Sequence, residues 1–361
     1  MANKQCTFVF DTAAGRIALD PSILQGKLRE IGPFTLHDGR IDPKNGTLYE
    51  LPEIKVQALT VQKAKGFLYK FEGLSAGFGQ QLSGILGLSD LGAVKILLDY
   101  QNSAVVIHRS AWRLDSADVT EVGLRNDASR GSFDTEHASF ETEIEGEPCA
   151  FTVDSGDNGC VEVPFTLFDR FVEAGVIKVA ERPGRTLSAL GITRNKRGWF
   201  LKGRLMGREL TGVSVTTSSQ LGLLGLGWLC GFQTEIDLTA RKLRYRAIEH
   251  PRPPISVQRM LGAILLYRDG RQVIESLQPD AVGPAERAGM KAGDIIHQFG
   301  SLVDNGITGT KVIEVVAANA GGRIPVKLYR PEGAQWLEVT LEIPEMISDW
   351  DFAGLPDRPP R

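Results

Sequence analysis

Short apolar runs of β-prone residues, separated by polar turns, recur along most of the chain. Two of these runs stop abruptly at an aspartate: residues 6–10 are followed by Asp11, and Phe151–Val153 by Asp154. A hydroxyl residue comes next in each place, Thr12 or Ser155. This pattern predicts two strands that each present a carboxylate at their end.

The two strand ends belong to a long repeat. A shift of 143 residues aligns six pairs, namely Asp11 with Asp154, Thr12 with Ser155, Cys6 with Cys149, Phe8 with Phe151, Pro21 with Pro164, and Gly32 with Gly175. A second block, Gly84–Leu88, matches Gly222–Leu226 at a shift of 138, and the same shift pairs Leu91 with Leu229 and Asp99 with Asp237. Two separated blocks in the same order indicate a tandem duplication.

Each copy is expected to continue with a short helix and to end with a strand. In the first copy, Asp20 can cap a helix and Pro21 fits its first turn, with Ile23, Leu24, Leu28 and Ile31 at helical spacing before Gly32. In the second copy, Phe168, Phe171 and Val172 form the same face, and Gly175 ends it. The closing strands are predicted at 104–107 and 242–245, each after the paired aspartate Asp99 or Asp237, to which we assign a structural role.

The domain boundaries follow from these blocks. We expect an N-terminal lobe at 1–110, a polar linker at 111–136 and a C-terminal lobe at 137–248, and a proline-rich boundary at 250–254. Residues 257–344 form a different module, and 345–361 are expected to fray. Within the module we predict strands at 262–266, 273–277, 324–329 and 337–343, with a helix near 311–318.

The duplicated part resembles the retropepsin-like aspartic proteases, arranged as two lobes in one chain as in pepsin. The resemblance covers nearly all of 5–247 and rests on Asp11–Gly15, on Asp154–Gly156 and on the two glycine-leucine blocks. It implies a mainly β, bilobal unit in which the second block of each lobe crosses beneath the catalytic loop. It also implies an aspartic-type endopeptidase acting on protein or peptide substrates.

The resemblance assigns the catalytic roles to Asp11 and Asp154. Two carboxylates held about 3 Å apart share one proton, so the ionised one can activate a water and the protonated one can polarise the peptide carbonyl. Which aspartate begins protonated stays open. Such a site needs no metal and no cofactor.

Five residues are expected to support the two catalytic loops. Thr12 and Ser155 would bond across the lobe junction, and Gly156 would leave space for substrate. Ala13 stands where the family usually has glycine, and its methyl either crowds the catalytic water or is accommodated. Asp157 adds a third carboxylate, which would raise the pKa of the pair.

The module at 257–344 resembles a bacterial-type PDZ domain, a small α+β fold, through the run Ala285–Ile296. The resemblance implies that an added peptide strand binds between the first strand and the helix. The peptide-binding residues it implies are Leu261, Gly262, Ala263, Ile264, Leu265, Val312, Val315 and Val316.

Composition and residue spacing narrow the range of possible functions. The net charge of −3 gives no support for nucleic-acid binding, and no apolar run approaches the roughly 20 residues of a membrane span. The five histidines (His37, His108, His137, His250, His297) and four cysteines (Cys6, Cys149, Cys160, Cys230) lack metal-ligand spacing, and free buried thiols are expected.

Two functions from different classes remain. The first is an endopeptidase whose PDZ module recruits substrate or regulates access; the second is a catalytically inactive protease-like scaffold with a peptide-binding PDZ domain, which Ala13 favours. The compartment also stays open: the bacterial cell envelope or periplasm if the N-terminus is trimmed, since no signal segment precedes the first strand, and the cytoplasm otherwise.

Overall fold

The structure is a computed structural model in which the chain is mainly β, with 48% of the described residues in strands and 15% in helices. It describes residues 6–345 except for 37–43, 57–58, 90, 93, 103, 109–112, 115–116, 126–136, 181–183, 189–190, 219–221, 250–259 and 278–282. The proline-rich boundary and nearly all of the predicted C-terminal tail therefore lie outside the described residues. The mainly β class is confirmed.

The chain divides into two compact units. The first holds Met1–Lys70 and Ser83–Pro253, and the second holds Phe71–Leu82 together with Pro254–Arg358. The first unit thus contains nearly all of both predicted lobes. The expected N-terminal lobe, 1–110, includes the short segment Phe71–Leu82. In the structure this segment packs with the second unit instead.

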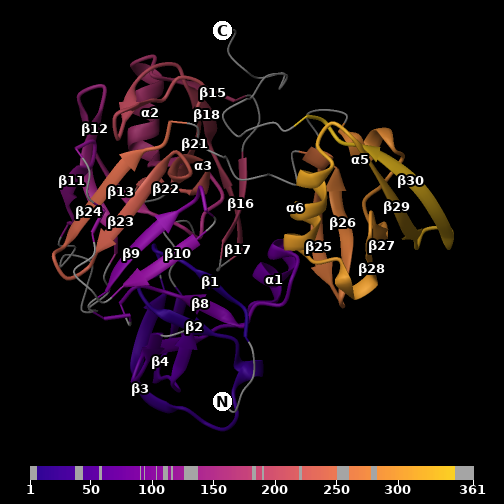
Figure 1. Cartoon of the computed structure of the whole chain (residues 1–361), viewed down its shortest axis with the longest axis horizontal. Coiled ribbons are helices and arrows are strands. Elements are labelled where there is room, and N and C mark those ends of the chain that lie inside the picture. The colour runs from indigo at the N-terminus through magenta and orange to yellow at the C-terminus, as the bar shows by residue number, and fades with distance from the viewer. Residues whose placement is uncertain are drawn as a thin grey trace. The chain divides into compact units, whose positions relative to one another are not determined.

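The N-terminal half of the first unit is built on a six-stranded sheet in the order β1-β8-β2-β7-β4-β3, drawn in indigo and purple in Figure 1. A separate hairpin pairs β5 with β6. The strands are β1 (Phe8–Phe10), β2 (Ile17–Leu19), β3 (Arg29–Leu36), β4 (Lys44–Glu50), β5 (Ile54–Val56), β6 (Leu59–Val61), β7 (Lys65–Leu68) and β8 (Gly84–Leu86).

The C-terminal half contains a seven-stranded sheet in the order β12-β13-β22-β14-β21-β18-β15, with two separate hairpins, β16–β17 and β19–β20. Two helices, α2 (Phe165–Glu173) and α3 (Leu226–Leu229), accompany it. The strands are β12 (Ser139–Ile144), β13 (Glu147–Val153), β14 (Val161–Pro164), β15 (Ile177–Val179), β16 (Gly184–Ser188), β17 (Gly191–Asn195), β18 (Arg197–Phe200), β19 (Arg204–Leu205), β20 (Arg208–Glu209), β21 (Ser214–Ser218) and β22 (Gly222–Leu224).

The same strand-pairing pattern occurs in both halves. In the first, β8 runs parallel to β1 and antiparallel to β2, and β2 runs parallel to β7. In the second, β22 runs parallel to β13 and antiparallel to β14, and β14 runs parallel to β21. Phe8 lies opposite Gly84 and Phe151 opposite Gly222, the pairs that the two sequence shifts relate. The internal sequence repeat therefore corresponds to a repeated topology.

A five-stranded sheet in the order β10-β9-β23-β24-β11 joins the halves. It contains β9 (Lys95–Asp99), β10 (Ala104–His108), β11 (Thr120–Gly123), β23 (Phe232–Asp237) and β24 (Lys242–Ala247). The strands predicted at 104–107 and 242–245 are present. The expectation of a linker throughout 111–136 is wrong at β11, which pairs with β24 from Thr120 to Gly123.

The two paired aspartates of this sheet make structural contacts. Asp99 accepts hydrogen bonds from Gln233 Nε2 at 3.2 Å and Asn102 Nδ2 at 2.9 Å. Asp237 lies 3.2 Å from Lys95 Nζ. Because Asp99 is opposite Gln233 and Asp237 opposite Lys95, both carboxylates fasten β9 to β23.

The helix expected in the first copy is wrong beyond its first turn. Asp20 does cap a turn, accepting from Ser22 N at 2.8 Å, but this 3-10 turn, η1, covers only Pro21–Ile23. The chain then forms β3, which pairs with β4 along its length. The counterpart in the second copy is α2, where Phe168 and Phe171 are buried as expected and Gly175 follows with a φ of 66°.

The second unit contains a sheet in the order β25-β26-β27-β29-β30, with β28 beside β27. Its strands are β25 (Ala263–Arg268), β26 (Arg271–Leu277), β27 (Ile295–Phe299), β28 (Leu302–Val303), β29 (Arg323–Arg330) and β30 (Gln335–Glu342). Its helices are α1 (Glu72–Phe78), α5 (Pro284–Arg287), the 3-10 turn η2 (Asp304–Gly306) and α6 (Gly309–Ala318). The predicted helix and strands of the module are therefore present.

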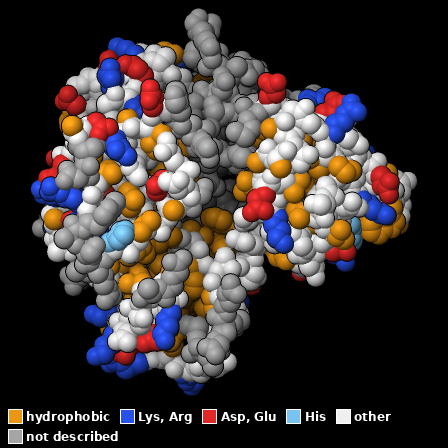
Figure 2. Space-filling model, in the orientation of Figure 1, with side chains coloured by type: hydrophobic (Ala, Val, Ile, Leu, Met, Phe, Trp, Pro, Cys, Tyr) orange, Lys and Arg blue, Asp and Glu red, His pale blue; other side chains and the backbone are white. Residues whose placement is uncertain are grey.

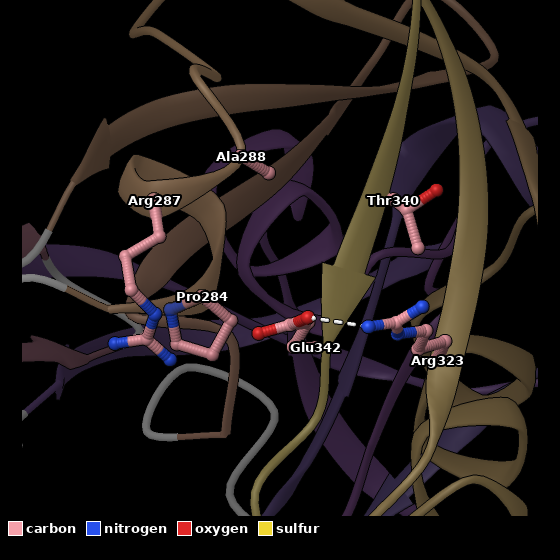
Figure 3. A pocket seen from close by; sticks show the side chains of 6 residues that line it. All are labelled: Pro284, Arg287, Ala288, Arg323, Thr340 and Glu342. Carbon is pink, nitrogen blue, oxygen red and sulfur yellow. Dashed lines mark hydrogen bonds and ion pairs between the residues drawn. The ribbon is translucent and has the colours of Figure 1, made fainter.

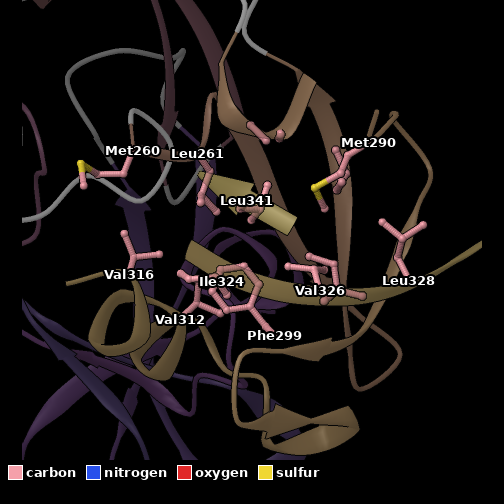
Figure 4. Close-up of a cluster of buried hydrophobic side chains, with 14 of the residues drawn as sticks. Met260, Leu261, Met290, Phe299, Val312, Val316, Ile324, Val326, Leu328 and Leu341 are labelled. Carbon is pink, nitrogen blue, oxygen red and sulfur yellow. The ribbon is translucent and has the colours of Figure 1, made fainter. Parts of the chain in front are cut away.

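The core of the second unit gathers side chains from its strands and from α6, as Figure 4 shows. Phe299, Val312, Val316 and Ile324 are each no more than 1% exposed. The apolar positions of α6 at 312 and 316 lie one helical turn apart, so both face the sheet.

On the face shown in Figure 2, the positive and negative side chains of the described residues are intermixed. Among the described residues, no helix has both the length and the apolar character needed to cross a membrane.

Candidate active site

The loop after β1 holds Asp11 by its backbone and by its side chain. Asp11 N donates to Leu86 O of β8 at 3.1 Å. Asp11 Oδ1 accepts from Ala13 N at 2.8 Å and from Ala14 N at 3.0 Å. A carboxylate that accepts the N–H groups two and three residues ahead closes a tight turn and fixes its own orientation.

Asp154 is held in a matching way at the end of β13. Its backbone N–H donates to Leu224 O of β22 at 2.9 Å, and its Oδ1 accepts from Gly156 N at 2.9 Å. The side chain is 6% exposed. Each aspartate therefore follows a strand whose parallel neighbour supplies the carbonyl that anchors it.

The two loops are locked together by Thr12 and Ser155. Thr12 N donates to Ser155 Oγ at 3.1 Å, and Ser155 N donates to Thr12 Oγ1 at 3.0 Å. The hydroxyls in turn donate to the strand ends of the opposite half, from Thr12 to Val153 O at 2.6 Å and from Ser155 to Phe10 O at 2.8 Å. These four bonds fix one loop against the other.

Gly156 contacts both aspartates. Its N–H bonds to Asp154 Oδ1, and a Cβ built on it would lie 2.8 Å from Asp11 Cγ and 2.9 Å from Asp11 Oδ2. The Asp11 carboxyl group thus lies directly over the backbone of the Asp154 loop. Both carboxyl groups therefore lie against the same glycine, and no larger residue fits at 156 without displacing Asp11.

The two glycine-leucine blocks lie against the loops that carry Asp11 and Asp154. In the first, Leu88 N donates to Ala14 O at 2.9 Å, and a Cβ on Gly87 would come within 2.4 Å of the same oxygen. In the second, Leu226 N donates to Asp157 O at 2.7 Å, and a Cβ on Gly225 would come within 2.9 Å of the same oxygen. Close backbone approach explains why glycine recurs in both blocks.

The Asp157 side chain accepts a hydrogen bond within the second loop. Its Oδ1 accepts from Gly159 N at 3.0 Å, and its Oδ2 would lie 2.9 Å from a Cβ on Gly225. This carboxylate is therefore placed against the glycine block that supports the loop.

Sequence analysis missed the role of His137. Its Nδ1 lies 3.0 Å from Ala13 O in the Asp11 loop. Because a carbonyl oxygen only accepts, Nδ1 carries the proton in this bond. Nothing in the local sequence marks this residue, since its partner is far away in the chain.

Tyr100 was also missed. It directly follows β9, and its hydroxyl is buried, with no hydrogen bond found for it among the described residues. Burial raises the pKa of the phenol, and the charges of Cys230 and Asp154 raise it further. Tyr100 therefore remains a protonated O–H group near the Asp154 side of the site.

The residues predicted to bind peptide in the module fall into two groups. Leu261, Ala263, Val312 and Val316 lie in the hydrophobic core, and Gly262, with a φ of 69°, lies against Gly283. Ile264, Leu265 and Val315 are only partly buried. The latter group is the part of the predicted set that retains accessible surface.

A pocket of about 400 Å³ also lies in the second unit, between α5 and the β29–β30 hairpin (Figure 3). It is lined by Pro284, Arg287, Ala288, Arg323, Thr340 and Glu342. Arg323 bonds Glu342 at 3.0 Å, with both side chains largely exposed.

Within the described ranges, no group of histidine, cysteine and acidic residues has the arrangement of a metal site. The candidate site is thus defined by two oriented aspartates, their interlocked hydroxyl residues and the glycine between them. No protein-family model matches the chain, and no curated protein resembles it significantly in sequence.

Proposed function

We propose that the protein is an aspartic-type endopeptidase in which Asp11 and Asp154 form the catalytic pair. The observation that carries this proposal is the contact of Gly156 with both aspartates, because it places the two carboxyl groups at one junction. The crossed bonds of Thr12 and Ser155 support it, since they hold the two loops in a fixed relation.

The chemistry follows from sharing one proton between two carboxyl groups. The ionised aspartate removes a proton from a water molecule, which attacks the carbonyl carbon of the peptide bond. The protonated aspartate donates to the carbonyl oxygen as the tetrahedral intermediate forms. The aspartate that took the proton from water then passes it to the nitrogen, and a hydroxyl of the tetrahedral intermediate gives its proton to the other aspartate as the carbon–nitrogen bond breaks. The products are a carboxylic acid and an amine, and the pair again carries one proton.

The loop bonds suit this role. Asp11 Oδ1 is occupied by two N–H groups and Asp154 Oδ1 by one, so each carboxylate has one oxygen committed to orientation. Fixed orientation keeps the reacting groups aligned without reorganisation during the reaction.

The module at 257–344 is proposed to be a PDZ domain that recruits substrate or regulates access. The partly buried Ile264 and Leu265 on the edge strand β25 support a peptide-binding role.

A catalytically inactive scaffold is the second candidate, and Ala13 is the residue that favours it. The Ala13 N–H bonds to Asp11 Oδ1, so its methyl group lies within the catalytic loop. Cleavage assays on the Ala13→Gly variant separate the two candidates.

The test is a peptide library incubated with wild type, Asp11→Asn and Asp154→Asn from acidic to neutral pH. Cleavage by wild type and loss of cleavage in both variants is the expected result, because an amide cannot take the proton from water. Circular dichroism and melting should stay near wild type. Normal cleavage by Asp11→Asn would exclude the pair, and silence of both wild type and Ala13→Gly would favour the scaffold.

A further inference from the structure

The segment Phe71–Leu82 lies between β7 and β8 in the sequence but packs within the second unit. Its helix α1 contacts strand β25, and Figure 1 draws α1 beside β25 and α6. β25 is the last strand of its sheet and pairs with β26 alone among the described strands. The helix therefore lies at the edge where an added peptide strand would bind.

The contact centres on the carbonyl oxygen of Gly79. This oxygen accepts from Gly309 N, at the start of α6, at 2.9 Å and from Gln272 Nε2 at 3.0 Å. Gln272 is 1% exposed, and its amide also donates to Ile307 O at 3.3 Å. A buried amide is costly unless it is hydrogen-bonded, so the module presents two hydrogen-bond donors arranged for one backbone oxygen.

Two glycines allow the end of α1 to approach the start of α6 closely. Gly79 ends α1 with a φ of 67°, and a Cβ on it would lie 2.6 Å from Gly309 Cα. A Cβ on Gly309 would lie 2.2 Å from Phe78 O. The two backbones thus touch directly, and a side chain at either position would force them apart.

We infer that β25, Gln272 and Gly309 form a docking surface for a short helix ending in a left-handed glycine, and that its resident ligand is Phe71–Leu82 of the same chain. Gln272 and Gly309 recognise the free carbonyl of the helix end, and the absence of a side chain at 79 provides selectivity. An external peptide that extends the sheet at β25 competes with α1 for this edge. The inference does not depend on catalysis.

Hydrogen exchange measured on the full chain tests the inference. We expect Gly309→Ala and Gln272→Leu each to speed exchange of the α1 amides by about 10-fold or more, since each breaks the contact with Gly79. Alanine favours a helix, so Gly309→Ala should not weaken α6 itself. Gly306→Ala is the matched control, because nothing lies within 4 Å of a Cβ at that position.

The expected pattern is faster exchange at α1 in the two contact variants, with β29 and β30 protected as in wild type and α1 unchanged in Gly306→Ala. Wild-type exchange at α1 in both contact variants would overturn the inference. So would unprotected α1 amides in the wild type, or an equal effect from Gly306→Ala.

Discussion

Thr12 and Ser155, which are 143 positions apart, each donate a backbone N–H to the other's side-chain oxygen, at 3.1 and 3.0 Å. The separation equals the sequence shift that relates the two copies, so equivalent residues of the repeat bond to one another. This reciprocal pair gives the candidate site its approximate two-fold symmetry. The symmetry is incomplete, since the residue that follows is Ala13 in one loop and Gly156 in the other.

Removing the Thr12 hydroxyl should destabilise the fold as well as the site. Thr12 is 0% exposed, and its Oγ1 both accepts from Ser155 N and donates to Val153 O. Thr12→Val leaves Ser155 N–H and Val153 C=O without their hydroxyl partner. We therefore expect the free energy of unfolding to fall by about 1–3 kcal/mol. Denaturant titration measures the change, and Thr12→Ser, which keeps the hydroxyl, is the control. Equal losses in the two variants would contradict this role of the hydroxyl.

The two positions after the hydroxyl residues should respond in opposite ways. A methyl on Gly156 would press on the Asp11 carboxyl group, so Gly156→Ala should lower kcat/KM by about 100-fold through misalignment. Ala13→Gly removes a methyl and should preserve or raise turnover.

Gly32→Ala is the control for the Gly156 variant, because a Cβ at Gly32 meets nothing within 4 Å. Peptide cleavage is the measurement, with melting temperature to detect unfolding. Full activity in Gly156→Ala would show that the Asp11 carboxyl group is not confined by residue 156.

His137 is expected to hold the Asp11 loop through the carbonyl of Ala13. In His137→Asn the amide nitrogen stands near the position of Nδ1, so this variant should retain the bond, whereas His137→Phe should lose about 1 kcal/mol of stability and part of kcat. His137→Gln is the control, because its amide reaches toward the Nε2 position instead.

The hydrogen bond between His137 and Ala13 can also be measured without an activity assay. NMR of ¹⁵N-labelled histidine should show His137 with its proton on Nδ1 at neutral pH. A proton on Nε2 alone would contradict the bond, whatever the variants do.

The duplicated site could be predicted from sequence because its parts are short-range. Asp11 and Thr12 recur at a shift of 143 and the Gly84–Leu88 block at a shift of 138, in the same order, and the loop bonds from Asp11 to Ala13 and Ala14 span only a few residues. Their chemistry is visible in the residue types themselves.

The errors and omissions concern contacts that are distant in sequence. Residues 23–31 have helical spacing, yet pairing of β3 with β4 outweighs it. β11 is polar, and only its partner β24 makes it a strand. His137, Tyr100 and the Gly79–Gly309 contact depend on residues brought together by folding, so no local pattern marks them.

Cys149 should make stability fall at alkaline pH. Burial raises the pKa of its thiol to about 11, with the charge of Glu147 adding to the shift and a backbone hydrogen bond opposing it. A cysteine in the unfolded chain has a pKa of about 8.5. The folded protein therefore keeps this proton over a pH range in which the unfolded chain has lost it.

The sign of the effect follows from proton linkage. Between about pH 8.5 and 11 the folded state binds more protons than the unfolded state, so the free energy of unfolding decreases as pH rises; below this range the thiol contributes no pH dependence. Denaturant titrations across pH 7–11 should show a shallower decline for Cys149→Ala than for wild type. Tyr100 adds a parallel decline at higher pH in both proteins, since burial raises its pKa too, so the difference between the two curves isolates Cys149. Cys6→Ala, which removes a less buried thiol, is the control and should follow wild type. Identical slopes for wild type and Cys149→Ala would contradict a neutral, buried thiol at this position.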